Sequence, residues 1–113
     1  MSNLNMKIDL FDNGNMAFIT LKCGITYIGT YNRNHQLDRG DLYSSQDLNC
    51  DTMIYRGHFK NIFNNGKIVF EGLGIQYFNH YYYEGFFKNG YFYGVGTLYE
   101  LQSRNVLYNG NFA

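Results

Sequence analysis

Several residue types and features are scarce or missing in this chain of 113 residues. It has no proline, no tryptophan and two cysteines, Cys23 and Cys50, which form no Cys-x-x-Cys pair. We therefore expect two free thiols in a reducing cytoplasm. Charge is also balanced, with 9 Lys and Arg against 9 Asp and Glu. No long-range field favours polyanions or anionic lipid, so nucleic acid is not an expected partner.

Long apolar runs are missing as well. No window approaches the roughly 18 uninterrupted apolar residues that a membrane-spanning helix needs. The opening residues, Met1 to Lys7, lack the apolar stretch of a secretory signal. A chain of this length has room for one domain, which leaves none for a separate catalytic domain. We expect a soluble cytoplasmic protein that does not span a membrane.

What the chain does have is aromatic residues and glycine, with 12 Tyr, 10 Phe and 13 Gly. This mixture favours strands and glycine-centred turns. Four segments share the order aromatic, any residue, Gly, any residue, aromatic, and recur at a spacing typical of structural repeats. They are Tyr27 to Tyr31, Tyr55 to Phe59, Tyr83 to Phe87 and Tyr108 to Phe112, with central glycines Gly29, Gly57, Gly85 and Gly110.

The spacing of this motif predicts an aromatic face on a sheet. Residues two apart in a strand share a face, so both aromatics and the glycine point the same way. We expect the glycine to leave a gap in which a ring from a neighbouring strand lies on the backbone. A helix is disfavoured, because each interior glycine costs about 1 kcal/mol relative to alanine.

A second half-motif follows each of the first three segments, so each unit is predicted to contain two strands. These half-motifs are Gly40 to Tyr43, Gly72 to Tyr77 and Gly94 to Tyr99. Asn-Gly pairs at Asn13, Asn65 and Asn89 supply positive φ for tight hairpins, which indicates an antiparallel meander. Residues 1–23 depart from the repeat and are predicted to form a hairpin cap, whereas residues 24–113 form the repeats.

The segment Tyr83 to Tyr99 resembles the MORN repeat at all its fixed positions, and the flanking units resemble degenerate copies. These positions are Tyr83, Gly85, Phe87, Gly90, Gly94, Gly96 and Tyr99. The resemblance implies an all-β fold, an elongated single-layer antiparallel meander of hairpins with an open groove. MORN repeats occur in cytoskeletal, ciliary, junction and viral proteins and in some enzymes, where another domain carries the catalysis. By this analogy the chain binds or scaffolds.

Residues that could support other chemistry carry no local signature. A nucleophile needs a nearby base, and the candidates are scattered; they are Ser2, Ser44, Ser45, Ser103, Cys23, Cys50, His35, His58 and His80. The three histidines recur at similar spacing but fall at unequal positions of the repeat, so a shared metal site is not expected.

The glycines do not indicate a phosphate-binding loop either. Such a loop leads into the N-terminus of a helix, whereas Gly94-Val95-Gly96 continues into a predicted strand. Base stacking would need a basic groove as well as aromatics. We expect no catalysis, no cofactor and no metal.

A protein partner is expected, because a single-layer sheet leaves aromatic rings partly exposed and ends in an open strand edge. The predicted groove and edge residues are Tyr55, Phe59, Tyr83, Phe87, Tyr108 and Phe112, and the structural glycines are Gly29, Gly57, Gly85, Gly94, Gly96 and Gly110. The occupant would be a peptide, a helix or a second copy of the chain. The predicted function is a non-catalytic structural or adaptor role in a cytoskeletal, ciliary or viral assembly. The alternative is an adaptor at a phospholipid surface or a regulator of an enzyme in trans.

Overall fold

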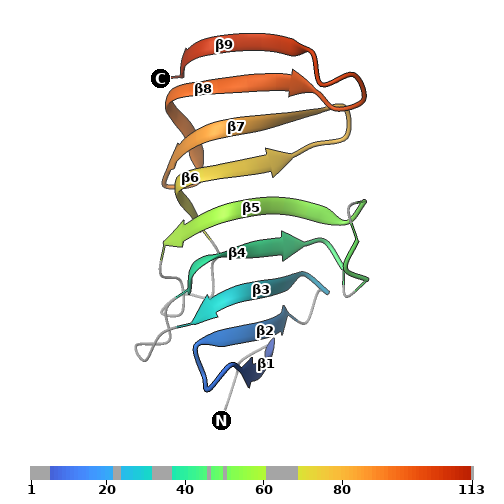
Figure 1. Ribbon diagram of the computed structural model, residues 1–113, viewed down its shortest axis with the longest axis vertical. Coiled ribbons are helices and arrows are strands. Elements are labelled where there is room, and N and C mark those ends of the chain that lie inside the picture. Colours follow the sequence, from blue (N-terminus) through green and yellow to red (C-terminus); the bar gives the residue numbers. More distant parts are fainter. Residues whose placement is uncertain are drawn as a thin grey trace.

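The chain folds into one antiparallel sheet whose strands follow their order in the sequence. The computed structural model describes residues 6–21, 24–31, 37–45, 47–49, 51–60 and 69–112. These residues include no helix, and therefore none long and apolar enough to cross a membrane. They form nine strands in a meander (Figure 1). The strands are β1 (Met6–Phe11), β2 (Met16–Leu21), β3 (Thr26–Tyr31), β4 (Leu37–Tyr43), β5 (Met53–Lys60), β6 (Val69–Tyr77), β7 (Tyr81–Lys88), β8 (Tyr91–Glu100) and β9 (Val106–Phe112).

The predicted fold class is confirmed. The molecule measures 46 × 27 × 25 Å, and the strands succeed one another along its length in a single layer. The predicted N-terminal hairpin is present as β1 and β2, and β2 pairs with β3, so the hairpin continues the sheet.

Asn-Gly turns close two of the hairpins, as predicted. Asp12, Asn13 and Gly14 have φ of 53°, 56° and 84° between β1 and β2. Asn89 and Gly90 have φ of 53° and 88° between β7 and β8. Positive φ at both central residues gives the turn a twist that matches the strands it joins. The third predicted turn, at Asn65 and Gly66, lies outside the described residues.

The register of the strands brings the repeat glycines together. Each glycine pairs with the glycine of the next strand, and the resulting line crosses the sheet from β3 to β9. We call this line the glycine row; it contains Gly29, Gly40, Gly57, Gly74, Gly85, Gly96 and Gly110. Ala17 continues the row into β2, and Leu10 stands at the corresponding place in β1. A one-residue slip would turn every aromatic to the other face, so the row also marks the correct register.

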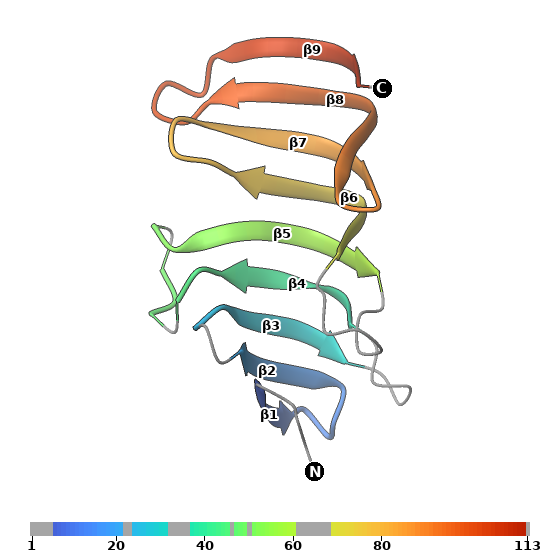
Figure 2. The ribbon, with the colours of Figure 1, turned by 180° about the vertical axis from the view of Figure 1, so that it is seen from behind.

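The side chains of the main buried cluster lie on one face of this sheet. They are Ala17, Ile19, Tyr27, Leu42, Tyr55, Phe59, Tyr83 and Phe87. The β7–β8 hairpin bends at its turn end and reaches the preceding unit (Figure 2). There the Gly90 N–H donates to the Phe70 carbonyl at 2.9 Å, and the Asn89 N–H donates to the Glu71 carboxylate at 2.8 Å. The bend folds the hairpin over the aromatic face, and this lets a single sheet enclose a core.

Candidate interaction site

The first tyrosine of each unit lies flat across the glycine row. A side chain added at Gly85 would meet the Tyr83 hydroxyl at 2.6 Å, and one added at Gly96 would meet the Tyr83 ring at 2.5 Å. Tyr27 covers Gly29 and Gly40, and Tyr55 covers Gly57 and Gly74, in the same way. The prediction that a neighbouring strand supplies the ring is therefore wrong. The ring comes from the same strand, two residues before the glycine, and it leans over its own glycine and the paired one.

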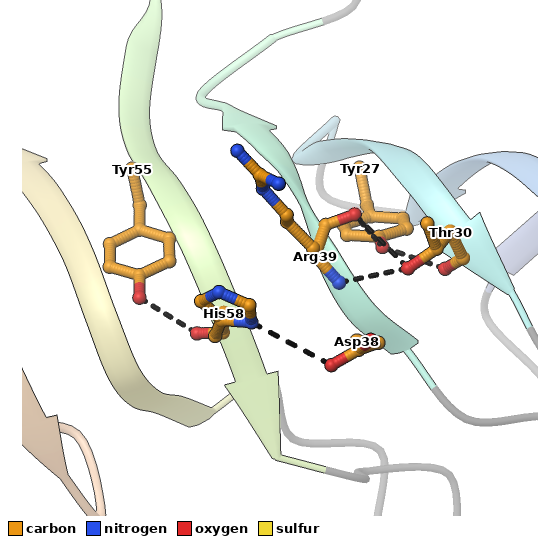
Figure 3. Close-up of polar contacts among 6 residues, drawn as sticks. All are labelled: Tyr27, Thr30, Asp38, Arg39, Tyr55 and His58. Atoms are coloured by element: carbon orange, nitrogen blue, oxygen red, sulfur yellow. Dashed lines mark hydrogen bonds and ion pairs between the residues drawn. The ribbon is translucent and has the colours of Figure 1, made fainter.

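The hydroxyl groups of these tyrosines share a single hydrogen-bond pattern. Each donates to the backbone carbonyl three residues later: Tyr27 to Thr30 at 2.8 Å, Tyr55 to His58 at 2.7 Å, Tyr83 to Phe86 at 2.8 Å and Tyr108 to Asn111 at 3.0 Å. Figure 3 shows the first two of these bonds, from β3 and β5. The bond satisfies a hydroxyl that burial would otherwise leave unpaired. It also pins the ring over the glycine.

Burial changes the acidity of these phenols. Loss of solvent around the ring raises the pKa of Tyr27 to about 12. Burial is also the main cause that raises the pKa of Tyr55 and of Tyr83 above the ordinary value. The phenolate is the form that water stabilises, so a dry environment favours the neutral hydroxyl. The three rings therefore remain hydrogen-bond donors at neutral pH.

In the second, third and fourth units, the second aromatic links the unit to the one before it. Phe59 meets Tyr27 and Tyr55 edge to face, Phe87 meets Tyr55 and Tyr83, and Phe112 meets Tyr83 and Tyr108, with centroids 5.0 to 5.2 Å apart. We call this series the aromatic ladder; it runs Tyr27, Phe59, Tyr55, Phe87, Tyr83, Phe112, Tyr108. Edge-to-face pairs add about 0.5–1.5 kcal/mol each beyond the area they bury. The ladder therefore joins the repeats along the whole sheet from β3 to β9.

A phenylalanine from the second strand of a unit lies parallel to the tyrosine. Phe70 of β6 stacks on Tyr55 at 3.8 Å with an angle of 3° between the rings. Phe92 of β8 stacks on Tyr83 at 3.9 Å and 9°. Sequence reasoning missed both phenylalanines. The signal was present, since each lies four residues before the row glycine of its strand, Gly74 or Gly96.

Of the six predicted groove residues, four are enclosed. Tyr55, Phe59, Tyr83 and Phe87 are each at most 5% exposed, because the rings of the ladder cover one another. These four therefore offer no free surface to a partner in this fold. Tyr108 is 47% exposed and Phe112 is partly buried. The accessible part of the predicted site is thus the end of the ladder on β9.

The predicted structural glycines divide into two kinds. Gly29, Gly57, Gly85, Gly96 and Gly110 belong to the glycine row, together with Gly40 and Gly74, which the predicted set omitted. Gly94 has a different role: a side chain there would meet nothing within 4 Å, but its φ is 66°. It lies within the bulge between β7 and β8, where left-handed backbone lets the strand bend.

The opposite face of the sheet carries exposed apolar side chains that sequence reasoning also missed. Leu73 pairs with Phe86, and Phe86 pairs with Tyr93, across three adjacent strands. Each of the three is about half exposed.

Charged side chains lie on this face as well. The Lys88 ammonium lies 5.0 Å from the centre of the Tyr93 ring. On the same face Arg56 makes a bidentate ion pair with Asp41, at 2.8 and 3.0 Å, between β4 and β5.

The structure describes five of the residues considered as nucleophiles or bases: Ser44, Ser45, His58, His80 and Ser103. The Ser103 hydroxyl donates to Glu100 and accepts from the Asn105 N–H in the turn before β9. His58 faces Arg39 across β4 and β5, 3.7 Å from the Asp38 carboxylate (Figure 3). Ser44 follows β4 at the end remote from His58, and the four residue steps from Arg39, the partner of His58, to Tyr43 alone span about 13 Å. Within the described ranges, no three His, Cys, Asp or Glu side chains gather as metal ligands would. Ser2, Cys23, His35 and Cys50 lie outside those ranges.

The geometry thus describes a ladder that is closed around three tyrosines and open at the fourth. Comparison of the chain with protein-family models, with curated proteins and with solved structures finds no match. The resemblance to the MORN repeat therefore stays a prediction made from the residues.

Proposed function

We propose that this protein is a non-catalytic structural or adaptor module that binds another protein at the open end of its aromatic ladder. One observation carries the proposal: Tyr108 is 47% exposed, whereas its three counterparts, Tyr27, Tyr55 and Tyr83, are at most 1% exposed. The motif around Tyr108 is otherwise complete, with its glycine, its second aromatic and its hydrogen bond.

The free edge of β9 supports the same proposal. Among the described strands β9 pairs with β8 alone, so the other side of β9 has backbone groups without a neighbouring strand. Exposed edges of this kind accept an added strand, which brings main-chain hydrogen bonds. Covering the exposed half of a tyrosine removes about 100 Å² from water, worth roughly 2.5 kcal/mol. Ring burial and strand pairing together can offset part of the cost of association.

The kind of assembly stays a prediction from the resemblance to MORN repeats. A cytoskeletal, ciliary or viral assembly would suit a small module whose edge strand can pair with a strand of a neighbouring protein. A neutral chain provides no electrostatic steering, so we expect partner recognition to depend on shape and strand pairing.

Affinity capture from the native lysate tests this function. We would immobilise the wild-type chain, Tyr108→Ala and the control Tyr91→Ala, and quantify bound proteins by mass spectrometry. Tyr91 is 77% exposed at the start of β8, so its loss removes exposed aromatic surface but does not change the ladder. We expect the wild type and Tyr91→Ala to retain a common set of partners that Tyr108→Ala loses. Equal capture by all three proteins would contradict the proposal.

A further inference from the structure

Two of the three strands that follow a buried tyrosine, β6 and β8, have a common sequence. In β6 the order is Phe70, Gly72 and Gly74, and in β8 it is Phe92, Gly94 and Gly96, each two residues apart. The phenylalanine stacks on the unit's tyrosine, and the last glycine pairs with the glycine of the unit's first strand. The middle glycine has positive φ in both strands, 90° at Gly72 and 66° at Gly94. The rule for the closing strands β6 and β8 is therefore aromatic-x-Gly-x-Gly, whereas β4, which follows Tyr27, shares only the row glycine Gly40 with them.

Each position of this rule has a physical reason. The last glycine must lack a side chain, because any β-carbon at Gly96 would overlap the Tyr83 ring. The middle glycine permits the left-handed bend that shifts the register by a bulge. That shift sets Phe92 opposite Phe87, beside the tyrosine that it covers.

The outer edge of β9 continues this interface. Tyr108 leans over Gly110 as Tyr83 leans over Gly85, and Phe112 meets it edge to face at 5.1 Å. Tyr83 has three aromatic neighbours, Phe87, Phe92 and Phe112, whereas Phe112 is the single ring neighbour of Tyr108 among the described residues. A closing strand supplies the two groups that Tyr108 and Gly110 lack among the described residues, a parallel ring and a second paired glycine.

We propose that β9 binds an extended segment of another protein that carries the sequence aromatic-x-Gly-x-Gly. The segment lies antiparallel to β9, with its last glycine opposite Gly110 and its aromatic ring stacked on Tyr108. This inference rests on the proposed function and names the chemistry of the partner. It makes the paired glycine, and not hydrophobicity alone, the determinant of specificity.

A second copy of the chain fits this edge poorly. In β1, the strand at the other end of the sheet, the row position is held by Leu10, whose side chain would occupy the space of the Tyr108 ring. Two β9 strands paired through Gly110 would bring two Tyr108 rings to one pair of glycines. Both arrangements place a large side chain at the position where a closing strand has a glycine.

Peptide binding tests the proposal directly. A fluorescein-labelled peptide with the β8 sequence Tyr-Phe-Tyr-Gly-Val-Gly-Thr-Leu-Tyr-Glu would be titrated with the full chain, and anisotropy recorded. We expect saturable binding. Replacing the last peptide glycine, in the change Gly96→Val, should weaken binding at least about tenfold, since overpacking of this kind commonly exceeds that factor. The peptide change Phe92→Ala should weaken it as well, because it removes the stacked ring.

Variants of the chain locate the site. Tyr108→Ala should abolish peptide binding, and Tyr108→Phe, which keeps the ring, should restore it. Leu107→Ala is the matched control, since Leu107 is the neighbour of Tyr108 in β9, is 54% exposed and is not part of the aromatic ladder. Circular dichroism and thermal melting would show that each variant is folded.

Three results would overturn the proposal. They are no binding of the β8 peptide, equal binding of the Gly96→Val peptide, and equal binding to Tyr108→Ala. If the peptide fails to bind while lysate capture still depends on Tyr108, the partner chemistry is wrong and the proposed function stands. If sedimentation also shows a dimer that Tyr108→Ala dissociates, the occupant is a second copy. If capture does not depend on Tyr108 either, both proposals fall.

Discussion

Tyr83 and Tyr108 occupy the same position of the same motif and have opposite environments. Both donate a hydroxyl to the carbonyl three residues later, and both meet a phenylalanine four residues on. Yet Tyr83 is fully buried and Tyr108 is 47% exposed. The difference comes from β8 and β9, which bring Phe92, Gly96 and Phe112 to Tyr83. Burial in this fold is therefore supplied by the next strand and not by the motif.

The largest expected effect on stability comes from removing the Tyr83 and Tyr108 rings in turn. Tyr83→Ala should lower the free energy of unfolding by about 3–5 kcal/mol, the usual cost of deleting a buried aromatic side chain. Tyr108→Ala should cost roughly 1 kcal/mol, because about half of its ring is already in water. Urea denaturation followed by circular dichroism would measure both. Similar losses would show that β9 does not leave the ladder open.

The glycines beneath the rings give a smaller difference. A side chain at Gly85 would meet the Gly96 backbone at 2.7 Å as well as the Tyr83 hydroxyl, whereas the three atoms nearest to one at Gly110 all belong to Tyr108, with its hydroxyl at 2.9 Å. Backbone cannot move aside as a half-exposed ring can. Gly85→Val should therefore cost about 1–3 kcal/mol or more, and Gly110→Val less.

The control for the glycine pair is Glu84→Ala. Glu84 is exposed on the face opposite the ladder, so its change should alter stability by no more than about 0.5 kcal/mol. Thermal shifts of the three variants would rank them. A Glu84→Ala loss as large as that of Gly85→Val would contradict the packing role of the glycine row.

The smallest expected effect is on the pH dependence of stability, and it comes from the buried tyrosine Tyr27. Burial raises the pKa of Tyr27 to about 12, above the value of about 10 expected in the unfolded chain. The neutral phenol thus favours the folded state, and its contribution is complete below about pH 10 and is lost as pH rises toward 12. Tyr27→Phe cannot ionise, so its stability should fall less between pH 10 and 12. Urea midpoints of both proteins over this range would measure the difference, and parallel curves would refute it.

Local patterns in the sequence were sufficient to predict the strands and the fold class. The alternation around Gly57 and Gly85 and the Asn-Gly turn at Asn89 each depend on neighbours within a few residues, so both could be read directly. The contacts of the aromatic rings could not be predicted from the sequence in this way. A shared face shows that Tyr83 and Gly85 lie on one side of the strand, but it does not show the direction in which the ring leans.

The sequence by itself determined a series of antiparallel hairpins with aromatics and glycines on one face, because side-chain alternation and turn geometry are local properties. Only the tertiary structure decided which of those aromatics are enclosed. That outcome depends on pairing across strands, on the bulge at Gly94 that bends a hairpin over its own face, and on the presence of a following strand. Residues with the same local sequence therefore form the core at Tyr55 and Tyr83 and an open surface at Tyr108.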